Sequence, residues 1–204
     1  GALSFTNTIP NYEWGMTLDV MRGDGNNRRI SFAGNAPVWD DKFALRLTAQ
    51  HHKSDGAIHN RKRGVKVLRT DKDGARIKAR VDLTPDIYLT AAAEYSLVKD
   101  NGPGFELVKG NGQTEILFSP FDPTYEEKPD RVSHLDAESY SERETVGGNF
   151  NIFWDLGGHE IALIAGYNDF TEILKYDSDA SPIPILTWDN DDDYTQWQAE
   201  LRLV

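Results

Sequence analysis

Three basic side chains alternate with apolar ones in ARIKARVDL, residues 75–83, where Arg76, Lys78 and Arg80 occupy every second position. Successive side chains of a β-strand point to opposite faces, so a strand places these cations together and the apolar residues on the other face. Arg46 has the same setting in the segment FALRLTAQ. A row of cations attracts anionic groups. Arg46, Arg76, Lys78 and Arg80 are therefore candidate contacts for an anionic ligand.

Basic charge is concentrated in residues 51–80, which hold ten Lys or Arg and three Asp, whereas the whole chain has a formal net charge of −11. Arg61 and Arg63 lie within this cluster, in the segment RKRG. The cluster either steers an anionic partner toward itself or is a solvated loop balanced by acidic neighbours, and both readings stay open. It has no interleaved aromatic residues and matches no nucleic-acid-binding module, which argues against a nucleic-acid partner.

The histidines and acidic runs do not have the spacing of metal or catalytic sites. His51 and His52 are adjacent, so on a strand they face opposite sides and at most one of them can join a common site. The acidic run DNDDD lacks the Gly and the distal Glu of an EF-hand loop. Ser133, His134 and Asp136 are too close in sequence to indicate a catalytic triad, which depends on spatial geometry. We expect no metal site, no cofactor and no enzymatic activity.

Alternation of apolar and polar residues recurs along the chain and predicts eight β-strands. The predicted strands are residues 13–22, 28–35, 43–52, 75–83, 87–97, 145–155, 161–171 and 194–204. Most are close to the roughly 9–11 residues that a tilted strand needs to cross a bilayer. A soluble sheet with one buried face has the same alternation, so the strands alone predict an all-β chain without deciding what covers the apolar face.

The connections between these strands fall into two length classes, according to the end of the strands that they join. APVWDDK, TPD and LGGHE are short and contain the Pro, Gly and Asp of tight turns. The opposite end has the short GDGNN and then loops of roughly 20, 45 and 20 residues. Short turns at one rim and long polar loops at the other are typical of transmembrane β-barrels. The loop pattern therefore favours an antiparallel meander that belongs to such a barrel.

The composition is compatible with a membrane sheet. The 204 residues are 39% apolar and include no Cys, so neither a disulfide nor a thiolate metal site is available. No run of 18 apolar residues is present, which excludes transmembrane helices but not transmembrane strands. The sequence starts with GALSFT, without Met or a leader peptide. We expect it to be a fragment of a longer protein.

Three stretches of the chain follow one another in a specific order, namely GALSFTNTIPNYEWGMTLDV, GNAPVWDDKFALRLTAQHHKSDGAIHN and YTQWQAELRLV. Together they resemble TonB-dependent outer-membrane receptors. The first is similar to the junction where the last strand of the plug domain runs through a Pro-containing linker into the barrel. The second is similar to the hairpin of the second and third barrel strands, and the third to a later strand, except that Ala199 separates Gln198 from Glu200. The match covers residues 1–98 and 194–204.

The resemblance implies that residues 1–10 are the end of a plug domain and its linker, and that residues 11–204 are the N-terminal part of the barrel domain. Barrels of this family have about 22 strands and a plugged lumen, so eight strands form an open part of a large transmembrane β-barrel. The implied protein is a transporter of the bacterial outer membrane. It takes up a scarce ligand such as a ferric siderophore, energised through TonB, which contacts the missing N-terminal region.

On this reading the apolar residues face lipid and the basic row faces the lumen. We expect Ile77, Ala79, Val81, Leu45 and Leu47 on the convex side of the sheet, and Arg46, Arg76, Lys78 and Arg80 on the concave side. Arg61 and Arg63 would lie at the outer rim, where they would contact the ligand or the phosphates of lipopolysaccharide. The expected partners are thus TonB, a small anionic ligand, and the lipid and lipopolysaccharide of the outer membrane.

Two other classes of protein stay open. A small closed eight-stranded outer-membrane barrel has the right number of strands and requires residues 13–22 to pair with residues 194–204. A soluble β-sandwich that binds glycans also has alternating strands. Recovery of the full-length protein without detergent would favour the sandwich over both membrane classes.

Overall fold

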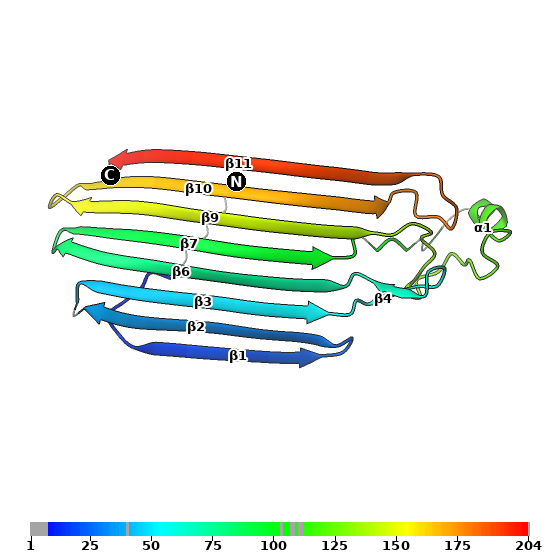
Figure 1. The fold of residues 1–204 in the computed structure, drawn as a ribbon, viewed down its shortest axis with the longest axis horizontal. Helices are drawn as coiled ribbons and strands as arrows, with labels where there is room; N and C mark the ends of the chain where they lie inside the picture. Colours follow the sequence, from blue (N-terminus) through cyan, green and yellow to red (C-terminus); the bar gives the residue numbers. More distant parts are fainter. Residues whose placement is uncertain (1–7, 40, 103, 107–108, 110–111, 204) are drawn as a thin grey trace.

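The structure, a computed structural model, describes residues 8–39, 41–102, 104–106, 109 and 112–203. Eight strands form one antiparallel sheet and lie side by side in chain order (Figure 1). They are β1 (Gly15–Gly23), β2 (Asn27–Trp39), β3 (Phe43–Ser54), β6 (Thr70–Thr84), β7 (Ile87–Asp100), β9 (Tyr140–Asp155), β10 (Glu160–Asp177) and β11 (Thr187–Leu203). All eight predicted strands are confirmed, and most are longer than the alternation indicated. The predicted end of the last strand, Val204, lies outside the described residues.

The sheet is open. Across the part of the chain that the structure describes, β1 pairs with β2 alone and β11 with β10 alone, so these two strands are the sheet's opposite edges. The small closed barrel requires a pairing of β1 with β11 and is therefore wrong. A sandwich requires a second large sheet packed on the first. The other sheet within the described residues has three strands of two or three residues each, so the sandwich is not the observed architecture either.

Tight turns join the strands at one end of the sheet. The turn between β2 and β3 is closed by a hydrogen bond from the Lys42 N–H to the Trp39 carbonyl at 3.0 Å. The turn between β9 and β10 is closed by the Leu156 N–H and the His159 carbonyl at 2.8 Å. Gly157 has φ 74°, in the left-handed region that glycine adopts without steric cost. The Gly and Asp of these segments thus form hairpin turns, as their composition predicted.

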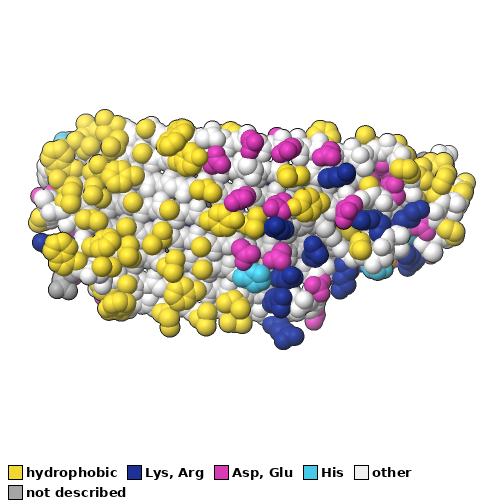
Figure 2. Space-filling model, viewed as in Figure 1, with side chains coloured by type: hydrophobic (Ala, Val, Ile, Leu, Met, Phe, Trp, Pro, Cys, Tyr) yellow, Lys and Arg dark blue, Asp and Glu magenta, His cyan; other side chains and the backbone are white. Residues whose placement is uncertain are grey.

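The register gives the sheet one apolar and one polar face. Leu47 pairs with Ile77 and Leu45 with Ala79, whereas Arg46 between them pairs with Lys78. Because directly paired residues share a face, the five apolar residues and the four basic residues predicted to separate lie on opposite faces. Figure 2 shows a band of hydrophobic side chains over the part of the strands near the tight turns, with charged side chains nearer the long loops. The two-faced arrangement is confirmed, and the assignment of convex and concave sides stays a prediction.

The long loops at the other end of the sheet fold together into a structure that we call the loop module, comprising the described residues of 55–69, 101–139 and 178–186. It contains β4 (Ile58–Asn60), β5 (Val65–Val67), β8 (Val132–Ser133) and α1 (Gln113–Phe118). β4 pairs antiparallel with β5 and parallel with β8, so the first long loop is joined to the second. None of these short elements has enough residues to show a periodicity, and the sequence did not predict them. Among the described residues, no helix has the length and apolar content needed to cross a membrane.

Most fully buried side chains of the described chain lie in the loop module rather than in the large sheet. Leu135, Phe118, Tyr125 and Val67 are between 1% and 7% exposed. The Phe118 and Tyr125 rings meet edge to face with centroids 5.1 Å apart, a favourable aromatic geometry. In contrast, Leu18 and Leu201 on the apolar face of the sheet are 62% and 73% exposed. The loops thus have a small core of their own, whereas the sheet presents its apolar face to the surroundings.

Candidate functional site

The four basic residues predicted to act together do share the polar face of the sheet. Arg46 comes from β3, and Arg76, Lys78 and Arg80 come from β6, the strand beside it. Arg46, Arg76 and Lys78, together with Thr8 and Thr48, line a hollow of about 140 Å³. Their common face follows from the two-residue period of a strand. The structure therefore gathers these cations on one polar surface, which has room for a small anionic group.

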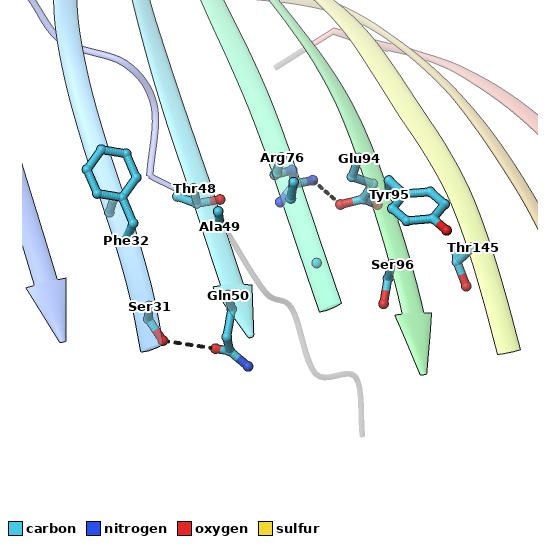
Figure 3. A pocket seen from close by; sticks show the side chains of 13 residues that line it. Ser31, Phe32, Thr48, Ala49, Gln50, Arg76, Glu94, Tyr95, Ser96 and Thr145 are labelled. Carbon is cyan, nitrogen blue, oxygen red and sulfur yellow. Dashed lines mark hydrogen bonds and ion pairs between the residues drawn. The ribbon is translucent and has the colours of Figure 1, made fainter. Parts of the chain in front are cut away.

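Arg76 is neutralised by a neighbour on the next strand. Its Nη2 lies 3.3 Å from the Glu94 Oε2, and the two side chains point toward one another from β6 and β7 (Figure 3). A second hydrogen bond on this face, from the Ser31 hydroxyl to the Gln50 Oε1, is 3.3 Å long. Both pairs border a wider hollow of about 640 Å³. Arg76 thus contributes to a polar lining in which its charge is already balanced.

Arg46 and Lys78 differ from Arg76, because neither has a hydrogen bond or ion pair to any other described residue. They are paired directly across the two strands, and like charges in that position repel each other. An anion placed between them would relieve the repulsion and gain two charge-assisted hydrogen bonds. Of the six predicted contact residues, this pair is the best suited to bind an anion.

Arg80 is held by three neighbours. Its Nε and Nη2 donate to both carboxylate oxygens of Asp82, at 2.8 and 3.3 Å. Its guanidinium lies over the Tyr88 ring at 4.7 Å and over the Tyr12 ring at 5.7 Å from the ring centroids. The charge of Arg80 is thus paired with a carboxylate, and its guanidinium is held in place by the two aromatic rings.

Arg61 and Arg63 lie in the loop module and not on the polar face of the sheet. The Arg61 Nη1 donates to the Thr124 carbonyl at 3.4 Å, and the neighbouring Lys62 Nζ donates to the Phe121 carbonyl at 3.1 Å. The Arg63 Nη2 lies 3.6 Å from the Glu138 Oε1. These contacts join the first long loop to the second, so the basic cluster has a structural use that the sequence did not reveal.

The two adjacent histidines face opposite sides, as expected. The His52 Nε2 lies 2.9 Å from the Asn27 Oδ1, and His51 lies with two carboxylates on the face that carries the apolar band. The His51 Nδ1 is 2.8 Å from the Asp73 Oδ1 and 3.9 Å from the Asp71 Oδ1. These three side chains have the atoms of a metal-ligand set. Lys53 lies 3.0 Å from Asp71, so the cluster is a charge-paired network at the end of the apolar band.

His134 pairs with an aspartate that the sequence did not single out. Its Nδ1 is 2.7 Å from the Asp122 Oδ2, and both residues are buried in the loop module. Burial by itself would raise the pKa of Asp122, but hydrogen bonds from Thr124 and His134 outweigh it and lower the pKa to about 2. The Thr124 contacts belong to a local turn in DPTY, which is readable from sequence, whereas the contact with His134 is not. The neighbours Ser133 and Asp136 form no triad with His134.

Two further buried polar residues fasten the loops and have no sequence signal. Asn60 is fully buried and donates from its side-chain amide to the Leu135 carbonyl at 2.8 Å, while its Oδ1 accepts from the Arg63 N–H at 3.1 Å. Asp177, at the end of β10, accepts from the N–H groups of Asp136 and Ala137 at 3.1 and 3.2 Å. These contacts join the first long loop to the second, and the second to the end of β10.

Known structures share this fold. The ferric yersiniabactin uptake receptor FyuA from Yersinia pestis matches 96% of this chain with a TM-score of 0.76 at 15% identity. The siderophore receptor PiuA from Acinetobacter baumannii matches 82% of it with a TM-score of 0.66 at 16% identity. FpvA from P. aeruginosa, solved with bound heterologous pyoverdines, matches 96% with a TM-score of 0.64 at 16% identity.

These matches concern one part of each receptor. The chain spans 28% of FyuA, 23% of PiuA and 25% of FpvA. No protein-family model matches the sequence, and no curated protein matches it either. The fold of the described residues is thus that of part of a large outer-membrane receptor barrel, open because it contains eight of the strands.

Proposed function

We propose that the chain is part of a TonB-dependent receptor of the bacterial outer membrane, which takes up a scarce anionic ligand such as a ferric siderophore. The observation that carries this proposal is the sheet itself. It has an apolar band on one face, a polar face on the other, tight turns at one rim and a folded loop module at the opposite rim. The likeness in fold to three siderophore-related structures supports the same class of function.

The proposed placement in the membrane follows from the solvent requirements of each part. The apolar band faces lipid, because an unpaired charge at the bilayer midplane costs about 2–4 kcal/mol. The polar face lines the lumen, and the loop module lies outside the cell. Residues 11–204 are then the N-terminal part of the barrel domain, and residues 1–10 are the end of a plug domain with its linker. Residues 1–7 lie outside the described residues, so the plug assignment is carried by the sequence resemblance.

The ligand contacts that we propose are Arg46 and Lys78, with Arg76 as a polar neighbour. Arg80 is the next basic residue on the same face and is held by Asp82 and two tyrosines. Arg61 and Arg63 hold together the long loops at the rim of the sheet. Lipopolysaccharide and lipid contact the outer face, and TonB contacts the part of the receptor that precedes this chain.

The proposal is tested with the full-length receptor in a strain that lacks its own ferric siderophore receptors. Growth on iron-limited medium is measured with a panel of ferric siderophores, and accumulation of the radioactive iron complex is measured with and without a proton-gradient uncoupler. We expect uptake of at least one complex, abolished by the uncoupler and by deletion of TonB. Surface-expressed receptor that supports no energy-dependent uptake of any complex would rule out the proposed function.

A further inference from the structure

The segment from Pro10 to Glu13 lies on the polar face of the sheet and is held there by Asn35 of β2. The Asn35 Nδ2 donates to the Asn11 carbonyl at 2.8 Å and to the Glu13 carbonyl at 2.5 Å. The Asn11 N–H donates back to the Asn35 Oδ1 at 3.2 Å. Asn35 is 7% exposed, and Pro10 is fully buried. One buried amide thus replaces the hydrogen bonds that a strand partner would supply to this segment.

Tyr12 fixes the same segment to β6 through Arg80. The Tyr12 and Tyr88 rings both lie over the Arg80 guanidinium, at 5.7 and 4.7 Å from their centroids, and Asp82 holds that guanidinium by two hydrogen bonds. Because Asp82 and Tyr88 already orient Arg80, little side-chain freedom is lost when Tyr12 docks. Arg80 is therefore a preorganised receptor site for one aromatic side chain of the chain's own N-terminal segment.

The residues on the N-terminal side of Pro10 are held differently. Thr8 and Ile9 are exposed, as Asn11 and Glu13 are, but among the described residues neither Thr8 nor Ile9 takes part in a hydrogen bond. Pro10 fixes its own φ and restricts the residue before it to extended conformations. The hydrogen-bonded part of the segment therefore begins after the Ile9–Pro10 bond.

We propose that residues 10–13 are a fixed anchor, which stays docked on β2 and β6 while the residues before Pro10 are displaced during uptake. This proposal rests on the proposed function, because it assigns a fixed end to the linker between plug and barrel. A force that pulls on the residues before Pro10 would be resisted by the docked residues 10–13. β1 would then stay paired with β2. Arg80 and Asn35 act as positioning residues and need not touch the transported ligand.

The first test measures docking without any transport. Hydrogen exchange is followed by mass spectrometry on the full-length receptor in detergent, for peptides that cover residues 10–14. We expect Arg80→Gln to accelerate exchange there about tenfold, because the Tyr12 ring loses its cation. Arg76→Gln is the matched control, since it removes the same charge from the same strand and face but has its partner in Glu94, and exchange at residues 10–14 should stay unchanged. Equal exchange in the wild type and in Arg80→Gln would overturn the role of Arg80.

The second test asks whether the anchor stays docked while the receptor works. Asn11→Cys and Asn35→Cys are combined in the full-length receptor, and oxidation forms a disulfide that joins the segment to β2. The 204-residue sequence contains no Cys of its own. We expect the oxidised receptor to accumulate the ferric complex at a rate within twofold of the reduced receptor. Loss of uptake on oxidation that reduction restores would show that the anchor must release. If the wild type transports nothing, the proposed function fails, and the exchange at residues 10–14 still decides whether the anchor is docked.

Discussion

Arg46 and Lys78 face each other across β3 and β6, and their charges have no counter-ion within the described residues. A hydrogen bond to a charged group contributes about 1.5–3 kcal/mol, and each 1.4 kcal/mol corresponds to about tenfold in affinity. We therefore expect the double variant Arg46→Gln, Lys78→Gln to weaken binding of an anionic ligand about tenfold or more, measured as the half-saturating concentration for energy-dependent uptake.

A matched control for this variant is available on the other face. Arg22 and Arg28 are paired directly across β1 and β2, close to the long-loop end of the sheet. Replacing both by Gln removes the same two positive charges, and we expect no change in the half-saturating concentration. An equal loss in both double variants would indicate a general effect of charge on ligand attraction rather than a binding site.

Asn60 is the residue whose loss should loosen the loops most. Its side chain is fully buried and joins the Leu135 carbonyl to the Arg63 N–H, so Asn60→Ala leaves both groups without a partner. A buried unsatisfied polar group costs about 1–3 kcal/mol. We expect faster proteolysis of the loops at 55–69 and 101–139 with an unchanged strand core, measured by mass spectrometry of the fragments. Uniformly faster cleavage of the whole receptor would contradict a loop-specific role.

At the scale of the elements, the strands and the loop module differ in how far sequence predicts them. β6 and β7 could be predicted because the two-residue period is a local property, and their faces follow from it. β4 and β8 could not, because they are short and pair residue 59 with residue 132 across a long separation. The basic row was likewise predicted as a row, and Arg80 pairs with Asp82 two residues along the same strand, but the pairing of Arg76 with Glu94 depends on the register of the neighbouring strand. The contacts of Arg61 with Thr124 and of Arg63 with Glu138 also join residues far apart in sequence, so the sequence did not reveal them.

The two faces of β7 can be compared directly at adjacent positions. Ala91 pairs with Ala79 on the apolar face, and Ala92 pairs with Lys78 on the polar face. A Lys on the lipid face near the midplane costs about 2–4 kcal/mol, whereas a Lys in a wet lumen costs little. We expect Ala91→Lys to lower the unfolding free energy of the full receptor in lipid vesicles by that amount, and Ala92→Lys to lower it by less than about 1 kcal/mol. A larger loss in Ala92→Lys would reverse the assignment of the faces.

The loop module should lose stability in acid through Asp122. The pKa of Asp122 falls from 3.8 to about 2 on folding, because hydrogen bonds from Thr124 and His134 outweigh the effect of burial. A carboxyl with a lowered folded-state pKa stabilises the fold above its unfolded pKa, and this contribution is lost as the pH falls through the folded value. We expect proteolysis of the loops by an acid protease to accelerate as the pH falls from about 4 to about 2. Over this range the free energy of unfolding of the loop module should decrease by on the order of 2 kcal/mol. Asp122→Asn should remove this part of the pH dependence, and an unchanged profile would assign it to other carboxyls.

For the whole molecule, the two open edges of the sheet determine whether it is stable in a membrane. β1 and β11 each have one hydrogen-bonded neighbour, so one side of each backbone is unpaired within the described structure. The apolar residues on these edges are among the most exposed, with Met16 of β1 at 77% and Trp197 of β11 at 76%. Lipid offers no hydrogen bonds to an open edge, so a spanning sheet must be closed by further strands. The eight strands are therefore stable in a membrane only as part of a larger ring.

This requirement gives a last prediction, on the 204-residue chain produced alone. Refolded into lipid vesicles, it should not form a closed barrel, because joining β1 to β11 directly would need a much tighter curvature than the sheet of a large receptor has. We expect heated and unheated samples of the short chain to migrate identically in gel electrophoresis. Added protease should digest the chain completely. The full-length receptor in the same vesicles should give both a heat-modifiable band and protected strands. A heat-modifiable, protease-resistant form of the short chain would show that eight strands suffice to close, and would restore the small barrel as the working architecture.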